Sequence, residues 1–204
     1  ARVIRPAMPD QHRAFFAQLP FIVTGSVDGA GQPWASVLAG PPGFVTAPAP
    51  NQLHIDARPA AGDPLAEALA IGARIGLLGI EPHTRRRNRA NGRIATLGDG
   101  GFDVRVLQSF GNCPKYIRAR QAEFVANGTA PGPIRHTPGL SDTDRRLIGA
   151  ADTFFIASAY PAAADDPDPA HGVDVSHRGG TPGFVRVDGD TLTVRLPDGP
   201  RLAF

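Results

Sequence analysis

A ten-residue sequence occurs twice in this chain, 140 residues apart. The copies are residues 36–45, SVLAGPPGFV, and residues 176–185, SHRGGTPGFV, which share Ser, Gly, Pro, Gly, Phe and Val without a gap. The flanks also match, since Phe21-Ile22 precedes the first copy as Phe155-Ile156 precedes the second. The strand-like Leu-His-Ile at 53–55 likewise has a counterpart in Leu-Thr-Val at 192–194. Repetition on this scale predicts one supersecondary unit that is used twice.

Composition sets wide limits on what the unit does. The chain has 204 residues, of which 42% are apolar, enough for a packed core, and no apolar run is long enough to span a bilayer. Cys113 is the only cysteine, so no internal disulfide can form and a reducing, cytoplasmic compartment is expected. The basic residues are arginine except for Lys115, which suits phosphorylated ligands or reflects codon usage. A net charge of +2 is too small to indicate nucleic acid.

Local patterns predict many short strands with a few helices. Asp10 is expected to cap a helix over residues 11–19, and an Asp-Gly turn at 28–31 joins two strands in a hairpin. A second helix should begin at Asp63-Pro64 and end at Gly72. The remaining pattern predicts strands at 21–27, 33–38, 44–45, 53–56, 74–80, 85–94 and 102–107.

The second half begins after a connecting segment. Cys113-Pro114 is expected to open a helix that runs to Asn127 and stops at Gly128. We therefore predict a first unit over residues 1–127, a linker and helix over 128–150, and the start of a second unit over 151–204. The fold class expected is α+β, mainly β, with a barrel that is closed or partly closed.

Two groups of residues resemble a known family. The Asp28-Gly29 hairpin with Trp34-Ala35-Ser36 and the Gly-Phe-Val strand is similar to the opening of the pyridoxamine 5'-phosphate oxidase-like family. Residues 108–117, QSFGNCPKYI, resemble an Asn/His-Cys-Pro-Lys segment of that family. The resemblance covers most of residues 19–196.

The resemblance implies a duplicated split β-barrel with short helices that binds FMN, commonly at a two-fold homodimer interface. Some members are oxidoreductases, and others bind a different cofactor, so the fold does not choose among activities. Neither nucleic acid nor a membrane is expected as a partner. The small-molecule substrate or electron partner is not identified by the sequence.

The second copy carries the best candidates for binding the FMN phosphate. A hydroxyl, an imidazole, a guanidinium and two amides without side chains occur in succession at Ser176, His177, Arg178, Gly179 and Gly180. The first copy keeps Ser36 but has Val37 and Leu38 where the second has His177 and Arg178. The alternative interpretation is a polar hairpin end with a surface arginine.

A basic strand is the second candidate. Alternation puts Arg85, Arg87 and Arg89 on one face of it, where Arg87 could contact a phosphate or a partner subunit. A solvated edge strand, protected by charge against aggregation, explains the same pattern. Cys113 at a helix start could have a lowered thiol pKa, although simple packing is the commoner fate of such a cysteine. No general acid, general base or metal-ligand spacing can be named.

Three functions stay open at this point. The first is an FMN flavoprotein, with transfer of hydride to an unknown substrate as its activity. The second is a non-catalytic module for dimerisation or cofactor binding, and the third is an anion- or nucleic-acid-binding barrel that uses residues 85–93. The second copy has no counterpart to the helix and strands of residues 63–94. We therefore expect a fragment of a longer chain, or completion by another chain.

Overall fold

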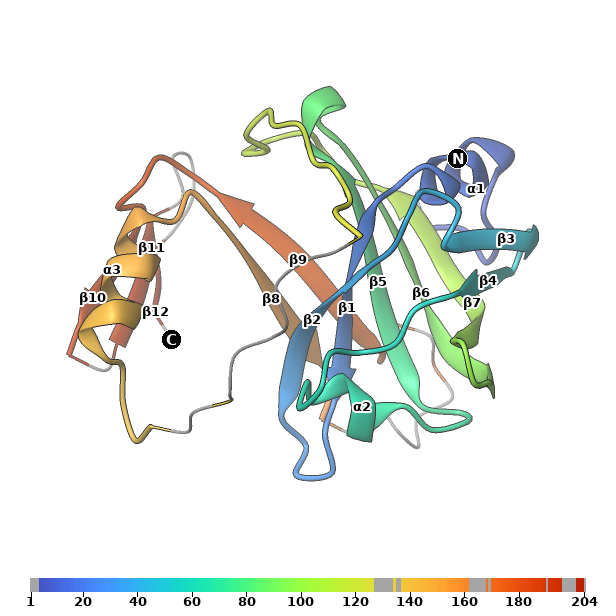
Figure 1. The fold of residues 1–204 in the computed structure, drawn as a ribbon, viewed down its shortest axis with the longest axis horizontal. Helices are drawn as coiled ribbons and strands as arrows, with labels where there is room; N and C mark the ends of the chain where they lie inside the picture. Colours follow the sequence, from blue (N-terminus) through green and yellow to red (C-terminus); the bar gives the residue numbers. More distant parts are fainter. Residues whose placement is uncertain are drawn as a thin grey trace.

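The protein is mainly β, with one large antiparallel sheet (Figure 1). The computed structural model describes residues 4–126, 134, 137–161, 168, 170–189, 191–195 and 201–203. The strands of the large sheet are β1 (Phe21–Val27), β2 (Pro33–Ala39), β3 (Val45–Ala49), β4 (Gln52–Ile55), β5 (Arg74–Glu81), β6 (Arg86–Leu97) and β7 (Phe102–Gly111). Their order is β2-β1-β5-β6-β7-β4-β3, and every neighbouring pair is antiparallel.

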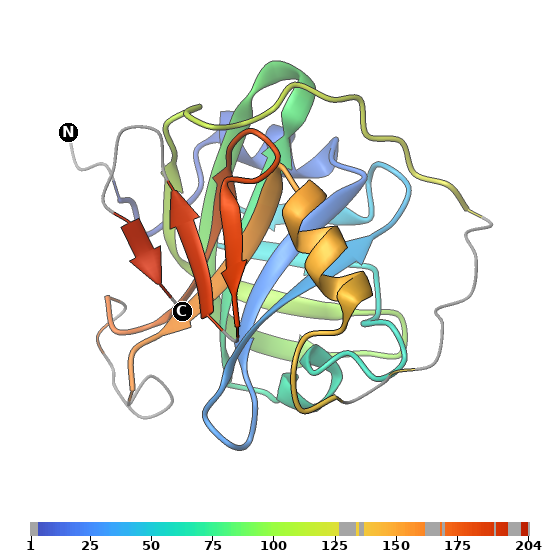
Figure 2. The same cartoon turned by 90° about the vertical axis from the view of Figure 1, so that its left-hand side faces the viewer.

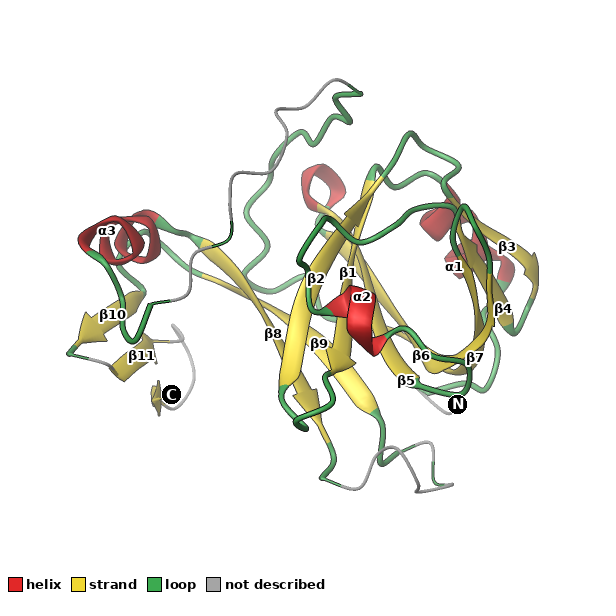
Figure 3. Ribbon diagram, turned by 60° about the horizontal axis from the view of Figure 1, so that its bottom comes forward, coloured by secondary structure: helices red, strands yellow, loops and turns green. Residues whose placement is uncertain are grey.

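This sheet curls around a single apolar core (Figure 3). All seven strands contribute side chains to the core, and helix α1 (Asp10–Ala17) adds Phe15 and Phe16. Strand β5 is buried at every position because one of its faces meets this core and the other is covered by a hairpin from the second half of the chain. No described residues pair β2 with β3, so the sheet is open at these two edges.

Local chemistry explains the first elements. The side chain of Asp28 accepts hydrogen bonds from the backbone N–H groups of Ala30 and Gln32, which closes the predicted turn between β1 and β2. Helix α1 begins one residue earlier than expected, so Asp10 lies in its first turn and Pro9 takes the cap position. Helix α2 (Leu65–Ala68) is shorter than expected. A 3-10 helix, η1 (Pro82–Thr84), connects β5 to β6.

In the second half of the chain, the described residues form one helix and five strands. These are α3 (Asp142–Ala150), β8 (Thr153–Ala159), β9 (Val173–Gly179), β10 (Val185–Asp188), β11 (Thr191–Arg195) and β12 (Arg201–Ala203). Strands β8 and β9 form a two-stranded sheet, and β10, β11 and β12 form a three-stranded one. Helix α3 and the three-stranded sheet stand apart from the large sheet, and the β8–β9 hairpin reaches from them to it (Figure 1). In the view from that side, they lie in front of the large sheet (Figure 2).

The β8–β9 hairpin packs face-on against β1 and β5. Val175 of β9 is fully buried with Val23 and Leu78. The backbones approach closely at two glycines: a Cβ on Gly76 would lie 2.8 Å from the carbonyl oxygen of Val173, and one on Gly25 would lie 3.0 Å from that of Asp174. Because glycine has no Cβ, the glycines of β1 and β5 allow the hairpin to pack this closely on the sheet.

The repeat in the sequence corresponds to a repeat in the structure. Copy one is α1-β1-β2-β3-β4 and copy two is α3-β8-β9-β10-β11, with the same strand pairs in each. Equivalent backbone hydrogen bonds recur: Gly40 N–H to Pro20 O at 3.1 Å and Gly180 N–H to Asp152 O at 3.0 Å, then Gly43 N–H to Ala17 O at 2.8 Å and Gly183 N–H to Gly149 O at 2.9 Å. Helix α3 therefore occupies the position in copy two that α1 occupies in copy one.

The flanking match differs from the one expected. Phe21 lies opposite Ala39 in copy one, and Thr153 lies opposite Gly179 in copy two. Because Ala39 and Gly179 are equivalent, Thr153-Phe154 replaces Phe21-Ile22, and the expected match with Phe155-Ile156 is wrong by two residues. A shift of two leaves the inward and outward alternation of a strand unchanged, so the hydrophobic pattern alone could not detect it.

The helix expected from Cys113 is absent from the described residues. Residues 112–126 contain only a turn, Tyr116 has a positive φ of 67°, and Cys113 is exposed. The segment is held by long-range contacts, because Arg118 Nε donates to the carbonyl oxygen of Gly180 at 3.1 Å. These contacts outweigh the helix signal, and the argument for a thiol activated by a helix falls with it. Asn127 and Gly128 lie outside the described residues.

Replacing Gly76 with alanine should separate the hairpin from the sheet. The added Cβ meets backbone atoms of β9, which cannot rotate away, so we expect the free energy of unfolding to fall by about 1–3 kcal/mol. Denaturant unfolding measures this change. Gly29→Ala is the matched control, because a Cβ at Gly29 meets no atom within 4 Å. Equal stability of the two variants would contradict the close packing of β9 on β5.

Candidate anion site between β6 and β9

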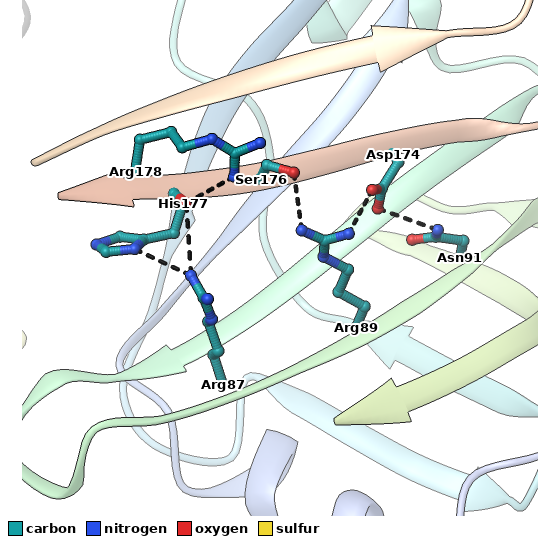
Figure 4. Close-up of polar contacts among 7 residues, drawn as sticks. All are labelled: Arg87, Arg89, Asn91, Asp174, Ser176, His177 and Arg178. Atoms are coloured by element: carbon teal, nitrogen blue, oxygen red, sulfur yellow. Dashed lines mark hydrogen bonds and ion pairs between the residues drawn. The ribbon is translucent and has the colours of Figure 1, made fainter. Parts of the chain in front are cut away.

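Long polar side chains connect the large sheet to copy two (Figure 4). Arg87, Arg89 and Asn91 alternate along β6 and share the face that looks toward β9. The close packing at Gly25 and Gly76 brings β9 within reach of these side chains. The site is therefore built by two segments that lie more than 80 residues apart in the sequence.

Arg89 forms the neutralised part of the site. One guanidinium nitrogen, Nη1, donates to Asp174 Oδ2 at 2.5 Å, and Nη2 donates to Ser176 Oγ at 2.7 Å. Asn91 Nδ2 donates to the other oxygen of Asp174 at 3.2 Å. The Nε of Arg89 is buried without a hydrogen-bond partner. The carboxylate of Asp174 compensates the charge of Arg89, and Arg89 in turn positions the hydroxyl of Ser176.

Arg87 holds a neutral histidine. Its Nε donates to the carbonyl oxygen of Cys113 at 3.0 Å, and its Nη1 lies 3.1 Å from Nδ1 of His177. His177 is 3% exposed. Burial, followed by the charges of Arg87 and Arg178, lowers the pKa of His177 to about 4, against a weaker raising effect from Asp152. The imidazole is therefore neutral near pH 7, and Nδ1 accepts the hydrogen bond from Arg87.

Positive charge in the site exceeds negative charge. Arg178 lies along β9, where its Nη1 donates to the carbonyl oxygen of His177 at 3.0 Å (Figure 4). Within the described part of the chain, no carboxylate forms an ion pair with Arg87 or Arg178. Burial lowers the pKa of Arg87, and the neighbouring charges of Arg89 and Arg178 lower it further, against a raising effect from Cys113. Such a cluster of half-buried guanidinium groups attracts an anion.

A polar pocket of about 270 Å³ adjoins Arg87. Three consecutive arginines line it at the start of β6, and Arg85 has the left-handed backbone conformation with φ 55°. The oxygen Oδ1 of Asn112 in this lining is buried without a hydrogen-bond partner. The lining residues are Gln11, His12, Thr84, Arg85, Arg86, Arg87, Asn88, Asn112 and Pro114.

The structure gathers four of the predicted site residues, namely Arg87, Ser176, His177 and Arg178. It does not bring Ser36 to them, because Ser36 Oγ donates to Asp63 at 2.5 Å in copy one. Gly179 and Gly180 have structural roles in the backbone. The amide of Gly180 donates to Asp152, and a Cβ on Gly179 would lie 2.2 Å from the carbonyl oxygen of Tyr116.

The basic strand is not a solvated edge. Strand β6 lies between β5 and β7, and its Arg87 and Arg89 face β9. Arg85 precedes the strand, and its left-handed conformation breaks the alternation that had placed it with them. Asp174 was missed as a site residue. The period of two that connects Asp174 with Ser176 was the available signal, but its partner on β6 was not visible in the sequence.

Comparison of the chain with models of protein families, with curated proteins and with solved structures gave no match. In the part of the chain that the structure describes, no three or more His, Cys, Asp or Glu residues are grouped so that they could hold a metal ion. None of the described helices is both long enough and apolar enough to cross a membrane.

The buried imidazole of His177 predicts a pH dependence of stability. Its pKa of about 4 in the folded protein lies below the ordinary value of 6.5, so the unfolded chain binds the proton first. The stabilising contribution is complete above about pH 6.5 and is lost as the pH falls toward about 4. Comparison of denaturant unfolding of the wild type and His177→Gln at pH 7 and pH 5 should show a larger loss for the wild type. An NMR titration that places the His177 pKa near 6.5 would contradict this account.

Proposed function

We propose that the chain is an FMN-binding flavoprotein and that Arg87, Arg178 and Ser176 hold the phosphate of the cofactor. The observation that carries the proposal is the surplus of positive charge between β6 and β9. Arg87 and Arg178 both donate to the carbonyl oxygen of His177, at 3.4 and 3.0 Å, yet neither has a carboxylate partner among the described residues. A dianion placed there would remove the repulsion between the guanidinium groups.

The donor set fits a phosphate group. Guanidinium groups present planar pairs of N–H donors that match phosphate oxygens. The hydroxyl of Ser176 accepts from Arg89, which leaves its own hydrogen available for a phosphate oxygen. The neutral His177 accepts from Arg87 and so orients that guanidinium. The pairing of Arg89 with Asp174 limits the excess charge to the two arginines that lack a carboxylate partner.

The flavin would supply the redox chemistry, since it exchanges hydride with a substrate, whereas this chain would bind and orient it. The proposal includes the split β-barrel as the fold, supported by the curled sheet around one core, and a homodimer as the assembly. Copy one lacks the polar pair that copy two contributes to the site. Val37 and Leu38 stand where copy two has His177 and Arg178, and Leu38 is buried in the core of copy one.

A non-catalytic module that binds an anion without a flavin is the second candidate. The lining of the pocket beside Arg87 favours it, because the described residues around that pocket include no Phe, Tyr or Trp on which a flavin ring could stack. The two candidates share the phosphate-binding residues and differ in whether the ring contributes to affinity.

Titration with FMN, riboflavin and inorganic phosphate distinguishes them. The flavoprotein hypothesis expects FMN to bind with quenching of flavin fluorescence, and riboflavin to bind more weakly because it lacks the phosphate. The anion module expects inorganic phosphate to bind about as tightly as FMN, with no binding of riboflavin. A protein that binds none of the three would contradict both hypotheses.

Arg178→Ala should weaken FMN binding by about 10- to 100-fold, because it removes a charge-assisted hydrogen bond to the phosphate. Fluorescence titration gives the dissociation constants for FMN and riboflavin. The affinity for riboflavin should stay unchanged. The dissociation constant for riboflavin divided by that for FMN should therefore decrease. Arg186→Ala is the matched control, since Arg186 is an exposed arginine of β10 that pairs with Asp188. An equal loss for both ligands would show that Arg178 does not contact the phosphate.

A further inference from the structure

The two copies of the repeat are completed differently. In copy one, β1 pairs with β5 and β4 pairs with β7, and β6 lies between β5 and β7. In copy two, β11 pairs with β12, whereas β8 pairs only with β9 among the described strands. The register shows that β12 takes the place of β7: Ile55 of β4 lies opposite Phe102, and its counterpart Val194 lies opposite Leu202. Among its described residues, copy two therefore has no counterparts of β5 and β6 between β8 and β12, and we call this missing pair of strands the gap.

An apolar pocket of about 290 Å³ lies in copy two beside this gap. It is lined by α3, β8, β10 and β11, and its lining residues are Ile148, Ala151, Phe154, Phe155, Ile156, Val185, Leu192 and Val194. Their counterparts in copy one include six fully buried members of the main core: Phe16, Leu19, Ile22, Val45, Leu53 and Ile55. The pocket is therefore the equivalent of the copy-one core, with one side left open.

Copy one shows what covers such a core. Phe15 on α1 is 1% exposed, whereas its counterpart Leu147 on α3 is 70% exposed. The strand that covers Phe15 is β5, because a Cβ on Gly79 would lie 2.8 Å from the ring of Phe15 and 2.7 Å from Leu19. Nothing among the described residues of copy two plays the part of β5 or β6.

We propose that copy two is a docking site for a two-stranded antiparallel β-hairpin of the β5–β6 kind, which inserts between β8 and β12. One strand of the hairpin would pair with β8 as β5 pairs with β1, through residues 154–157. The other would pair with β12 as β6 pairs with β7. Its inward side chains are apolar, since they replace the copy-one contributions of Ile75, Leu77 and Ala90. Backbone pairing supplies affinity, and the pocket selects the apolar side chains.

A second copy of this chain is the weaker candidate for the occupant. The gap accepts a hairpin whose two outer edges are both free to pair. Each described hairpin of this chain is either paired along an outer edge or, for β8–β9, packed on β1 and β5. Two copies that met through their open faces would also each bring the same gap.

The chain's own hairpin is the probe. Residues 73–98 are appended after Phe204 through a flexible Gly/Ser linker, which keeps the local concentration of the hairpin high. Hydrogen exchange of the backbone amides of residues 154–157 is compared with and without the appended segment. We expect exchange to slow by about tenfold or more and binding of a hydrophobic dye to fall. Unchanged exchange at residues 154–157 would overturn the proposal.

Two variants test whether the protection of residues 154–157 depends on the open face of copy two. Leu147→Asp in the fused protein should abolish the protection, because it places a charge where the hairpin would cover α3. Ile71→Asp is the matched control: Ile71 is 72% exposed but lies between α2 and β5, outside copy two, so the protection should persist. Circular dichroism checks that both variants fold. Amides already protected in the unfused chain, with a dependence on protein concentration, would assign the face to a second copy and overturn the hairpin.

Discussion

The close contact of β9 with β1 and β5 is the interaction on which the rest of the structure depends. It requires glycine at position 76, where a Cβ would lie 2.8 Å from the carbonyl oxygen of Val173, and is favoured by glycine at position 25, where a Cβ would lie 3.0 Å from that of Asp174. Once β9 lies this near, Val175 is sealed between Val23 and Leu78, and the arginines of β6 reach the polar side chains of β9. The apolar packing of β9 thus positions the polar site, and a mutation of either glycine is expected to disturb both the packing and the site.

Charge and burial are balanced unevenly in that site. Asp174 neutralises Arg89, and the neutral state of His177 removes one more charge from the interior. Arg87 and Arg178 keep theirs, and burial, followed by the repelling charges of Arg89 and Arg178, lowers the pKa of Arg87. A protein tolerates such repulsion where solvent or a bound anion offsets it. The unequal copies sharpen this interpretation, because Leu38, the copy-one equivalent of Arg178, is apolar and buried in the main core.

Comparison of the two copies distinguishes the pairings that both share from the additional strands that cover the apolar face of copy one. A helix and four strands recur with equivalent pairings and hydrogen bonds in the two copies, although the elements around each copy differ. Neither copy can enclose its own apolar face with these elements alone. Copy one gains β5, β6 and β7 from the same chain, and the exposed Leu147 and the open pocket of copy two record the lack of a matching pair.

The sequence by itself determined the repeat, the mainly β character, the bounds of β1 and the stripe of arginines. These depend on periodicity and turn chemistry, which are local. It could not determine that β6 is a central strand, that Arg89 meets Asp174, or that residues 114–126 form no helix. Those features depend on which segments lie together in the folded chain. Only the tertiary structure decided them, because the pairing of β6 with β5 and β7, the bond from Arg118 to Gly180 and the contact of Arg89 with Asp174 leave no local pattern in the sequence.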